Sequence, residues 1–258
     1  MINHRRTFLK KFMSVTSGIY LGGQLSGAYA RNDGQASPQI DHVAKSLLIK
    51  QIGHKGTFDI HLADRLLEKN ASFQLVDTVN WPAFPYKPEV KFKMAYCQDS
   101  IFLKFYVSEE NILAHVTKIN GDVCTDSCVE FFISLGRDNT YYNFEFNCIG
   151  VPHVEYGQKG KRIQVDPEVV RKVRVKSSLG DQPFSEKRGG HQWQMMIVIP
   201  KGCFCFDKDL NFKGLRAKAN FYKCGDKTSV PHYVTWNPVK TPGPDYHQPS
   251  FFGDLLFQ

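Results

Sequence analysis

Apolar and polar residues alternate along several separate stretches of this 258-residue chain. Successive side chains of a β-strand point to opposite faces of the sheet, so a period of two predicts strands that each bury one face. Such short strands become stable when their apolar faces pack against a second layer. The clearest alternation is found in residues 101–107, 129–133, 142–148, 193–199 and 217–221.

Turn-forming residues separate these stretches and help to set the fold class. Asn120-Gly121, Gly189-Gly190 and Pro242-Gly243-Pro244 are typical turn sequences. Leucines at helical spacing predict one short helix within residues 60–67. Helical and strand patterns do not alternate along the chain. The sequence therefore predicts an all-β fold, an antiparallel β-sandwich of the jelly-roll or immunoglobulin-like type with one or two short helices.

The N-terminal segment has the residue order of a secretory leader. The pair Arg5-Arg6 comes shortly before Phe-Leu-Lys, and a weakly apolar stretch rich in Gly and Ser covers residues 12–27. Ala28-Tyr29-Ala30 then offers small residues around a cleavage site. The apolar stretch is too short and too polar to span a membrane well. We expect a twin-arginine export signal over residues 1–30, and a periplasmic or secreted protein.

The remaining chain is expected to hold one domain. Residues 31–50 are predicted to form a linker and a lead-in strand, and residues 51–258 a single β-sandwich. Four of the 33 Lys and Arg lie in the leader, so 29 basic residues stand against 25 acidic ones after its removal. This small excess argues against a nucleic-acid partner. No later apolar run could span a membrane, and we expect a monomer.

The seven cysteines leave at least one thiol free or available to a second chain. Oxidation after export could form disulfides, but the spacing does not assign the pairs. The pairs Cys124/Cys128 and Cys203/Cys205 lack the further Cys or His ligands of a typical zinc site. The motifs of the chain therefore predict no organic cofactor, and they leave the metal content, structural calcium included, open.

Polar residues on the other side of the predicted strands form a candidate site. Asn143, Glu145 and Asn147 share one face because alternate residues of a strand point the same way. Glu130 and Asn220 lie on the polar sides of other strands. If these strands are neighbours, their amides and carboxylates could bind sugar hydroxyls, which both donate and accept hydrogen bonds. An ordinary solvated sheet face is the alternative interpretation.

The C-terminal part adds aromatic residues to this candidate site. A proline-rich loop over residues 242–249 can hold Tyr246 and His247 in place with little further loss of entropy. The sequence favours neither a core position nor a ligand contact for Trp236. For Tyr246, ligand contact is the preferred role.

Three segments of the chain resemble one known family. Residues 126–133 (Asp-Ser-Cys-Val-Glu-Phe-Phe-Ile), 141–150 and 220–257 are similar to the carbohydrate-binding module family 9-like domains, part of the wider group of DOMON-like sandwiches. The resemblance runs from about Gln51 to the last residue. It implies a sandwich that binds sugar without cleaving it. Some modules of the family hold structural calcium, but no dense Asp cluster in this chain marks such a site.

The resemblance also implies roles for single positions. The binding Glu of the family falls on Glu130, and its binding Arg falls on Glu145. The second of two aromatic residues that clamp the sugar falls on Tyr246. The first falls on Cys124, which cannot stack as a ring does.

These observations predict an exported, non-catalytic protein that holds a sugar or glycan end in a shallow pocket by aromatic stacking and side-chain hydrogen bonds. The predicted carbohydrate-binding residues are Glu130, Asn143, Glu145, Asn147, Asn220, Lys223, Trp236, Tyr246 and His247.

Three alternatives remain open at this point. A glycoside hydrolase or lyase could use Glu130 and Glu145 as a carboxylate pair. A haem-binding redox domain could draw axial ligands from Met195, Met196 and the histidines at 115, 153, 191, 232 and 247. A sandwich that binds another protein, with a decayed sugar pocket, would fit the missing aromatic residue at Cys124.

Overall fold

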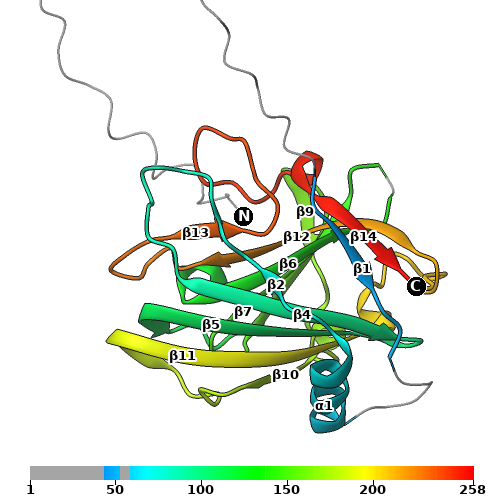
Figure 1. Cartoon of the computed structure of the whole chain (residues 1–258), viewed down its shortest axis with the longest axis horizontal. Helices are drawn as coiled ribbons and strands as arrows, with labels where there is room; N and C mark the ends of the chain where they lie inside the picture. Colours follow the sequence, from blue (N-terminus) through cyan, green and yellow to red (C-terminus); the bar gives the residue numbers. More distant parts are fainter. Residues whose placement is uncertain (1–43, 53–58, 137) are drawn as a thin grey trace, which may run out of the picture. The chain divides into compact units, whose positions relative to one another are not determined.

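Two β-sheets stack face to face in the computed structural model, which describes residues 44–52, 59–136 and 138–258. Figure 1 shows the two layers, with strands β12 and β6 in one and β4, β5 and β11 in the other. The predicted export signal and the predicted linker up to residue 43 lie outside the described residues. The domain boundaries proposed from the sequence stay a prediction.

The larger sheet has nine strands, and its main path runs β1-β14-β12-β6-β7-β8-β9. Strand β13 pairs with β12 and with β3, off this path. All of its pairs are antiparallel except β1 with β14, a parallel pair that the sequence did not predict. The strands are β1 (Ser46–Ile49), β3 (Thr78–Val79), β6 (Cys128–Ser134), β7 (Tyr141–Asn147), β8 (Pro152–Gln158), β9 (Lys161–Gln164), β12 (Arg216–Cys224), β13 (Tyr233–Thr235) and β14 (Gly253–Phe257).

The smaller sheet has five strands in the order β10-β11-β5-β4-β2. They are β2 (Gln74–Leu75), β4 (Glu89–Cys97), β5 (Ser100–Ala114), β10 (Arg174–Ser177) and β11 (Phe184–Pro200). Helix α1 (Ile60–Asn70) packs against one end of this sheet through Ala63 and Leu67, which contact a cluster that includes Phe102 and Val198. A second, short helix is α2 (Pro167–Val170). Short 3-10 turns cover Val123–Thr125, Lys201–Cys203 and Pro249–Phe251.

Aromatic residues from both sheets fill the space between the layers. Phe92 of β4 stacks on Phe221 of β12 with ring centroids 3.8 Å apart, and Phe131 stacks on Phe221 at 5.1 Å. These residues occupy the apolar positions of the period-two pattern, which the pleat directs inward. Burial of one such side chain stabilises the fold by about 1.5–3 kcal/mol. The alternation in the sequence is thus the direct cause of the two-layer core.

The predicted fold class is confirmed. Each of the five alternating stretches is a strand or lies largely within one, and the helix expected within residues 60–67 extends to Asn70. All seven cysteines lie in the described part of the chain and all are free thiols. Within the same residues, no helix has the length and apolar character needed to cross a membrane.

Candidate functional site

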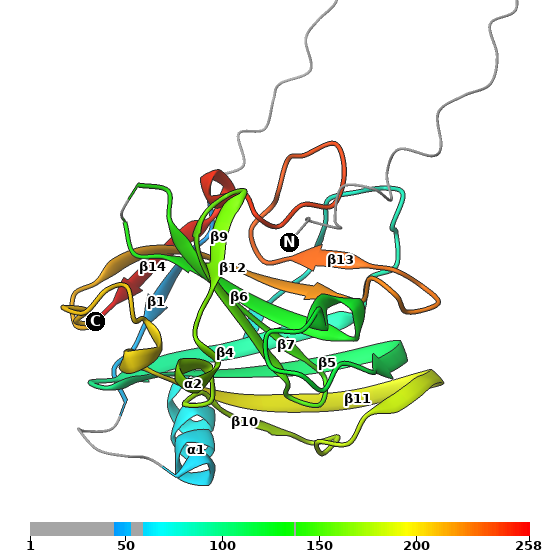
Figure 2. The same cartoon turned by 180° about the vertical axis from the view of Figure 1, so that it is seen from behind.

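The outer face of the nine-stranded sheet gathers part of the predicted site. In the register of neighbouring strands Glu130 of β6 lies beside Glu145 of β7, and Glu145 lies beside His153 of β8. Asn143 lies one position along the same face, opposite Glu155. Figure 2 shows β6, β7 and β9 of this sheet from behind. Strands far apart in the sequence therefore bring carboxylates and an amide to one surface.

The centre of this surface is covered. Glu130 and Glu145 have exposed fractions of 3% and 2%, and Asn143 is fully buried. The predicted stacking residue Tyr246 is itself 7% exposed and lies on Tyr222, with ring centroids 4.1 Å apart. Its hydroxyl donates to the carbonyl of Lys223 at 3.0 Å. The loop that carries Tyr246 thus closes over the sheet.

One buried polar atom in this centre has no partner in the described part of the chain. The side-chain amide of Asn143 donates to Oε1 of Glu145 at 3.0 Å, but its Oδ1 accepts no hydrogen bond. Beside it, the thiol of Cys224 donates to Oε1 of Glu130 at 3.2 Å. A buried acceptor without a donor is costly, so Asn143 marks a place where a further donor would stabilise the protein.

The sheet is more open toward β8 and β9, where half-buried charged groups are found. Arg162 donates through Nε to Glu155 at 2.9 Å and through Nη1 to the hydroxyl of Tyr141 at 3.2 Å. His153 lies 3.6 Å from the same carboxylate, and its Nδ1 donates to the carbonyl of Gly121. These residues continue the polar surface outward from Glu145.

The charges on this side support one another. Burial raises the pKa of Glu155, but the hydrogen bond and charge of His153 and the charge of Arg162 outweigh it and lower the pKa to about 2. Burial lowers the pKa of His153, but Glu155 and the nearby Glu145 outweigh it and raise the pKa above its ordinary value. Both pKa shifts favour the charged forms of His153 and Glu155, and the contacts between these side chains order them.

His247, one of the residues predicted to bind carbohydrate, lies at the margin of this set. Its ring stacks on Phe132 with centroids 5.1 Å apart. Its Nδ1 lies 3.1 Å from the hydroxyl of Tyr141, and its Nε2 lies 3.4 Å from Nη2 of Arg162. Because the guanidinium can only donate, Nε2 accepts from Arg162 in this arrangement. The ring is half-buried.

Two predicted binding residues hold the backbone instead. Asn147 donates to the carbonyl of Val116 and to Asp126, and its Oδ1 accepts from the backbone of Val151 at 2.9 Å. Asn220 donates to the carbonyl of Asn237 and accepts from its N–H. Both amides are fully buried and occupied by these bonds, which fix the loops next to the site.

Lys223 and Trp236 do not lie on this surface. The prediction that Lys223 binds a ligand there is wrong, and of the two roles left open for Trp236 the structure shows the core position. Trp236 packs in the core between the sheets, edge-on to Phe221 at 5.5 Å. Lys223 points to the same interior, where its Nζ lies 2.7 Å from Oε2 of Glu109 and 2.7 Å from Nε2 of His232. Its position two residues after Phe221 in β12 places it on the core face.

Glu155 and Arg162 are not among the residues predicted from the sequence, and His153 is there only a candidate haem ligand. The signal was present: His153 and Glu155 flank Val154 in a further alternating stretch, and β9 follows directly. Arg162 also supplies a guanidinium to the face on which Glu145 occupies the position of an expected arginine. The cation comes from β9, two strands away from Glu145.

Among the described residues, one group of side chains is close enough to share a metal ion. The donor atoms of Cys128, Glu130 and Cys224 lie within 4.8 Å of one another. Burial raises the pKa of Cys128 to about 12, and a hydrogen bond with Cys128, together with burial, raises the pKa of Cys224. A metal ion would have to displace both protons, and the donor set is too poor in oxygen for calcium.

The positions of the candidate haem ligands and of the candidate catalytic carboxylates give little support to the haem and hydrolase alternatives. Met195 lies in the core, and Met196 lies beneath α1. Glu130 and Glu145 are neighbours, but both are buried.

Comparison with known proteins identifies the family of this chain. None of the curated proteins matches it. A crystal structure of a Bacteroides uniformis protein that has been proposed to bind carbohydrate is 38% identical, with a TM-score of 0.81, and the match covers 84% of this chain and 100% of that one.

Two further solved structures share the fold alone. They show a carbohydrate-binding module of family 9 from Caldicellulosiruptor kristjanssonii, one in complex with glucose and one with cellotriose. Each is 12% identical with a TM-score of 0.53, and the matches cover 83% of this chain and 96% and 94% of those chains. The model of the carbohydrate-binding family 9 matches residues 61–257. This chain therefore belongs to the carbohydrate-binding family 9.

Proposed function

We propose that the protein is exported and that it binds a carbohydrate without cleaving it, at the open side of the outer face of the nine-stranded sheet. The observation that carries this proposal is the ordered set of Glu155, Arg162 and His247 beside the buried Asn143 and Glu145. Family membership supports the ligand class.

Each group in this set matches a need of a sugar. Arg162 donates in a fixed fork and Glu155 accepts, so the two side chains can bind sugar hydroxyls, which both donate and accept hydrogen bonds. The salt bridge and the stacking of His247 on Phe132 order these side chains before a ligand arrives. Binding then loses little side-chain entropy.

The aromatic contribution differs from the one expected from the sequence. Tyr246 is stacked on Tyr222 and hydrogen-bonded at its hydroxyl. We propose that Tyr246 anchors the loop of His247 to the sheet, and that the half-buried ring of His247 is the one that a sugar can reach.

The binding proposal can be tested on an array of plant and host glycans, with glucose and cellotriose included. We expect weak binding by the wild-type protein, and binding about tenfold weaker in Arg162→Gln, because a charge-assisted hydrogen bond is lost. Arg171→Gln is the matched control, since that exposed arginine pairs with Glu168 on α2. No wild-type signal above background, or equal binding by Arg162→Gln, would refute the proposal.

Export is tested separately. Arg5→Lys/Arg6→Lys should keep the protein in the cytoplasm if the arginine pair is the export signal. Cell fractionation followed by immunoblotting measures this, and unchanged export of the double variant would contradict the twin-arginine route.

A further inference from the structure

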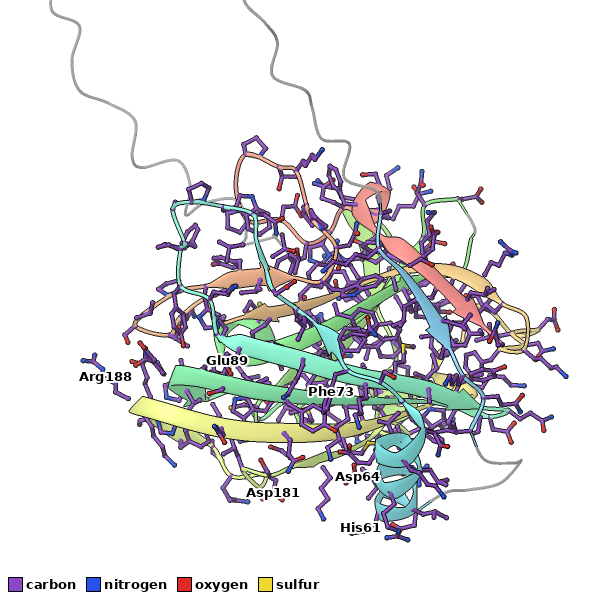
Figure 3. The ribbon with its side chains drawn as sticks, in the orientation of Figure 1. His61, Asp64, Phe73, Glu89, Asp181 and Arg188 are labelled. Atoms are coloured by element: carbon purple, nitrogen blue, oxygen red, sulfur yellow. The ribbon has the colours of Figure 1, made fainter. Side chains whose placement is uncertain are left out.

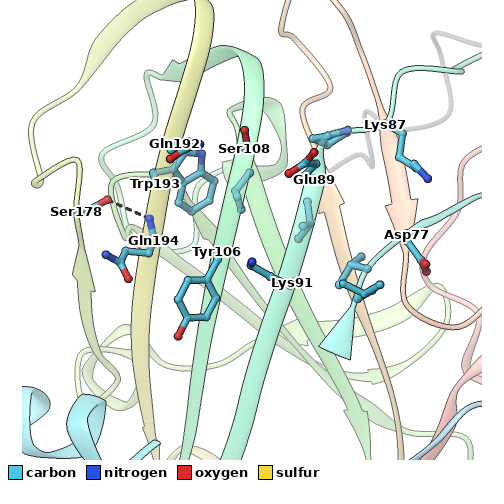
Figure 4. Close-up of a pocket in the computed structure, with 15 residues that line it drawn as sticks. Asp77, Lys87, Glu89, Lys91, Tyr106, Ser108, Ser178, Gln192, Trp193 and Gln194 are labelled. Atoms are coloured by element: carbon cyan, nitrogen blue, oxygen red, sulfur yellow. Dashed lines mark hydrogen bonds between the residues drawn. The ribbon is translucent and has the colours of Figure 1, made fainter. Parts of the chain in front are cut away.

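A groove of about 740 Å³ crosses the outer face of the other, five-stranded sheet (Figure 4). Its floor is formed by β4, β5 and β11, and helix α1 covers a different part of the same sheet. The volume lies in the range of about 300–1,000 Å³ that is typical of small-ligand sites. None of the carbohydrate-binding residues predicted from the sequence lines this groove.

Two rows of polar side chains cross the floor of the groove. In the strand register Glu89, Ser108 and Gln192 are cross-strand neighbours and form the first row. Lys91, Tyr106 and Gln194 form the second row, two residues further along each strand. Figure 4 shows both rows directed into the groove. Neighbouring strands lie about 4.8 Å apart, so each row places three polar groups over roughly 10 Å.

Four of these six side chains have no hydrogen-bond partner within the described part of the protein. Within the described residues, the side chains of Glu89, Ser108, Gln192 and Gln194 make no hydrogen bond or ion pair with the protein. The two amides each offer a planar donor and acceptor, the serine a hydroxyl and the glutamate an acceptor. The floor therefore presents these hydrogen-bonding groups at positions that the strand register fixes.

Tyr106 stands in the middle of the second row and is held rigidly. Its hydroxyl donates to Glu68 of α1, and its ring meets the exposed Phe73 edge-on at 5.1 Å. Figure 3 labels Phe73 and Glu89 over this side of β4 and β5. Lys104 also donates to Glu68 at 2.7 Å, so the carboxylate is fixed from several sides. A ring fixed before binding can contact an apolar ligand face with little loss of entropy.

The two walls of the groove are also ordered. Ser178, on the loop after β10, accepts a hydrogen bond from the backbone N–H of Gln194 at 3.0 Å, which ties that wall to the floor. Asp77 and Lys87 stand on the opposite side. The lining includes Lys87 and Lys91 against Asp77 and Glu89, so the charges balance. Such a groove therefore exerts little net electrostatic attraction on a strongly charged polymer.

We propose that this groove is a second saccharide-binding site, separate from the one on the nine-stranded sheet, and that it takes a neutral linear oligosaccharide. Planar amides, hydroxyls and a fixed aromatic ring suit the hydroxyls and the C–H face of a pyranose chain. A peptide strand could not add to the floor, because β5 is already paired on both edges, with β4 and β11. With sites on both sheets, one molecule could join two glycan chains.

The test follows the side-chain amide signals of Gln192 and Gln194 by NMR. The full protein is titrated with cellohexaose, xylohexaose, mannohexaose and laminarihexaose, each to millimolar concentration. We expect at least one hexasaccharide to shift both amide signals, and we expect Gln192→Ala/Gln194→Ala to weaken its binding to the groove by about tenfold, as the loss of two hydrogen bonds implies. Backbone signals of β5 report on the groove in this variant.

The controls separate the two sites. Gln98→Ala/Gln182→Ala removes two exposed glutamines outside the groove and should leave the response unchanged. Arg162→Gln should also leave it unchanged, whatever it does to the first site. The proposal is overturned if no hexasaccharide shifts the groove signals, if the groove double variant binds as the wild type does, or if Arg162→Gln abolishes the groove response.

Discussion

Glu130 and Glu145 are direct partners in the antiparallel register of β6 and β7, and both side chains are buried. Two adjacent carboxylates are the groups that a glycosidase needs, but a hydrolytic pair must also reach the glycosidic bond and a water molecule. In this protein their exposed fractions of 3% and 2% leave little room for either.

We therefore expect binding without cleavage. Incubation with soluble plant polysaccharides should release no reducing sugar above the buffer control, and Glu145→Gln should behave as the wild type does. A reducing-end assay measures the outcome. Release by the wild type that disappears in Glu145→Gln would contradict this prediction and revive the hydrolase alternative.

The buried cation Lys223 is expected to be critical for stability. Lys223→Met leaves Glu109 buried without its partner at 2.7 Å, and such a loss costs about 3–5 kcal/mol. Lys218→Met is the matched control on the same strand, because its exposed pair with Asp254 contributes about 0–1 kcal/mol. Urea denaturation measures both. Equal midpoints for the two variants would show that the buried pair is not stabilising.

His232 should make the protein less stable in mild acid. Burial and then the charge of Lys223 lower its pKa to about 3, whereas an unfolded histidine has a pKa of about 6.5. As the pH falls from about 6.5 toward 3, the unfolded chain gains a proton that the folded chain does not, so stability falls by up to about 1.4 kcal/mol per pH unit. Above that window the effect is absent.

The contribution of this one histidine can be isolated with two variants. Gln at position 232 keeps an acceptor for Lys223 and does not titrate, so His232→Gln should lose the acid-dependent difference in denaturation midpoint. His115→Gln changes an exposed histidine and should keep it. The same slope in His232→Gln and in the wild type would rule out this assignment.

The cysteines should be reduced and mostly unreactive. Burial raises the pKa of Cys203 to about 12 and also raises that of Cys205, yet Cys205 is the only one of the seven that is partly exposed. Titration with Ellman's reagent should detect at most one thiol in the native protein and seven after unfolding. Cys205→Ser should remove the native reaction. Five thiols in the unfolded protein would instead reveal a disulfide.

Several features of the fold could be predicted from single stretches of the chain. The alternation in residues 129–133 and 217–221 identified β6 and β12, and the leucines before Asn70 identified α1. The inward orientation of Lys223 could also be predicted from the sequence, because Lys223 shares its strand face with Phe221. Its cationic character, and not its position in the pattern, led to the wrong assignment.

Other features depend on partners far away in the sequence. Nothing in the segment around Glu145 indicates that β8 and β9 will place Arg162 on the same face, or that Tyr246 will stack on Tyr222 of that face. The groove over β4, β5 and β11 likewise consists of residues that each look like an ordinary solvated strand position. The strand register, which is set by packing of the whole sandwich, brings them together.

The amino-acid sequence alone determined the strands, the faces on which residues lie and the all-β class, because side-chain periodicity is a local property of the backbone. Only the tertiary structure decided which polar face is covered and which stays open, since that depends on strand order and on loops that close over the sheet. Glu145 is buried and Arg162 is partly exposed on the same face for this reason.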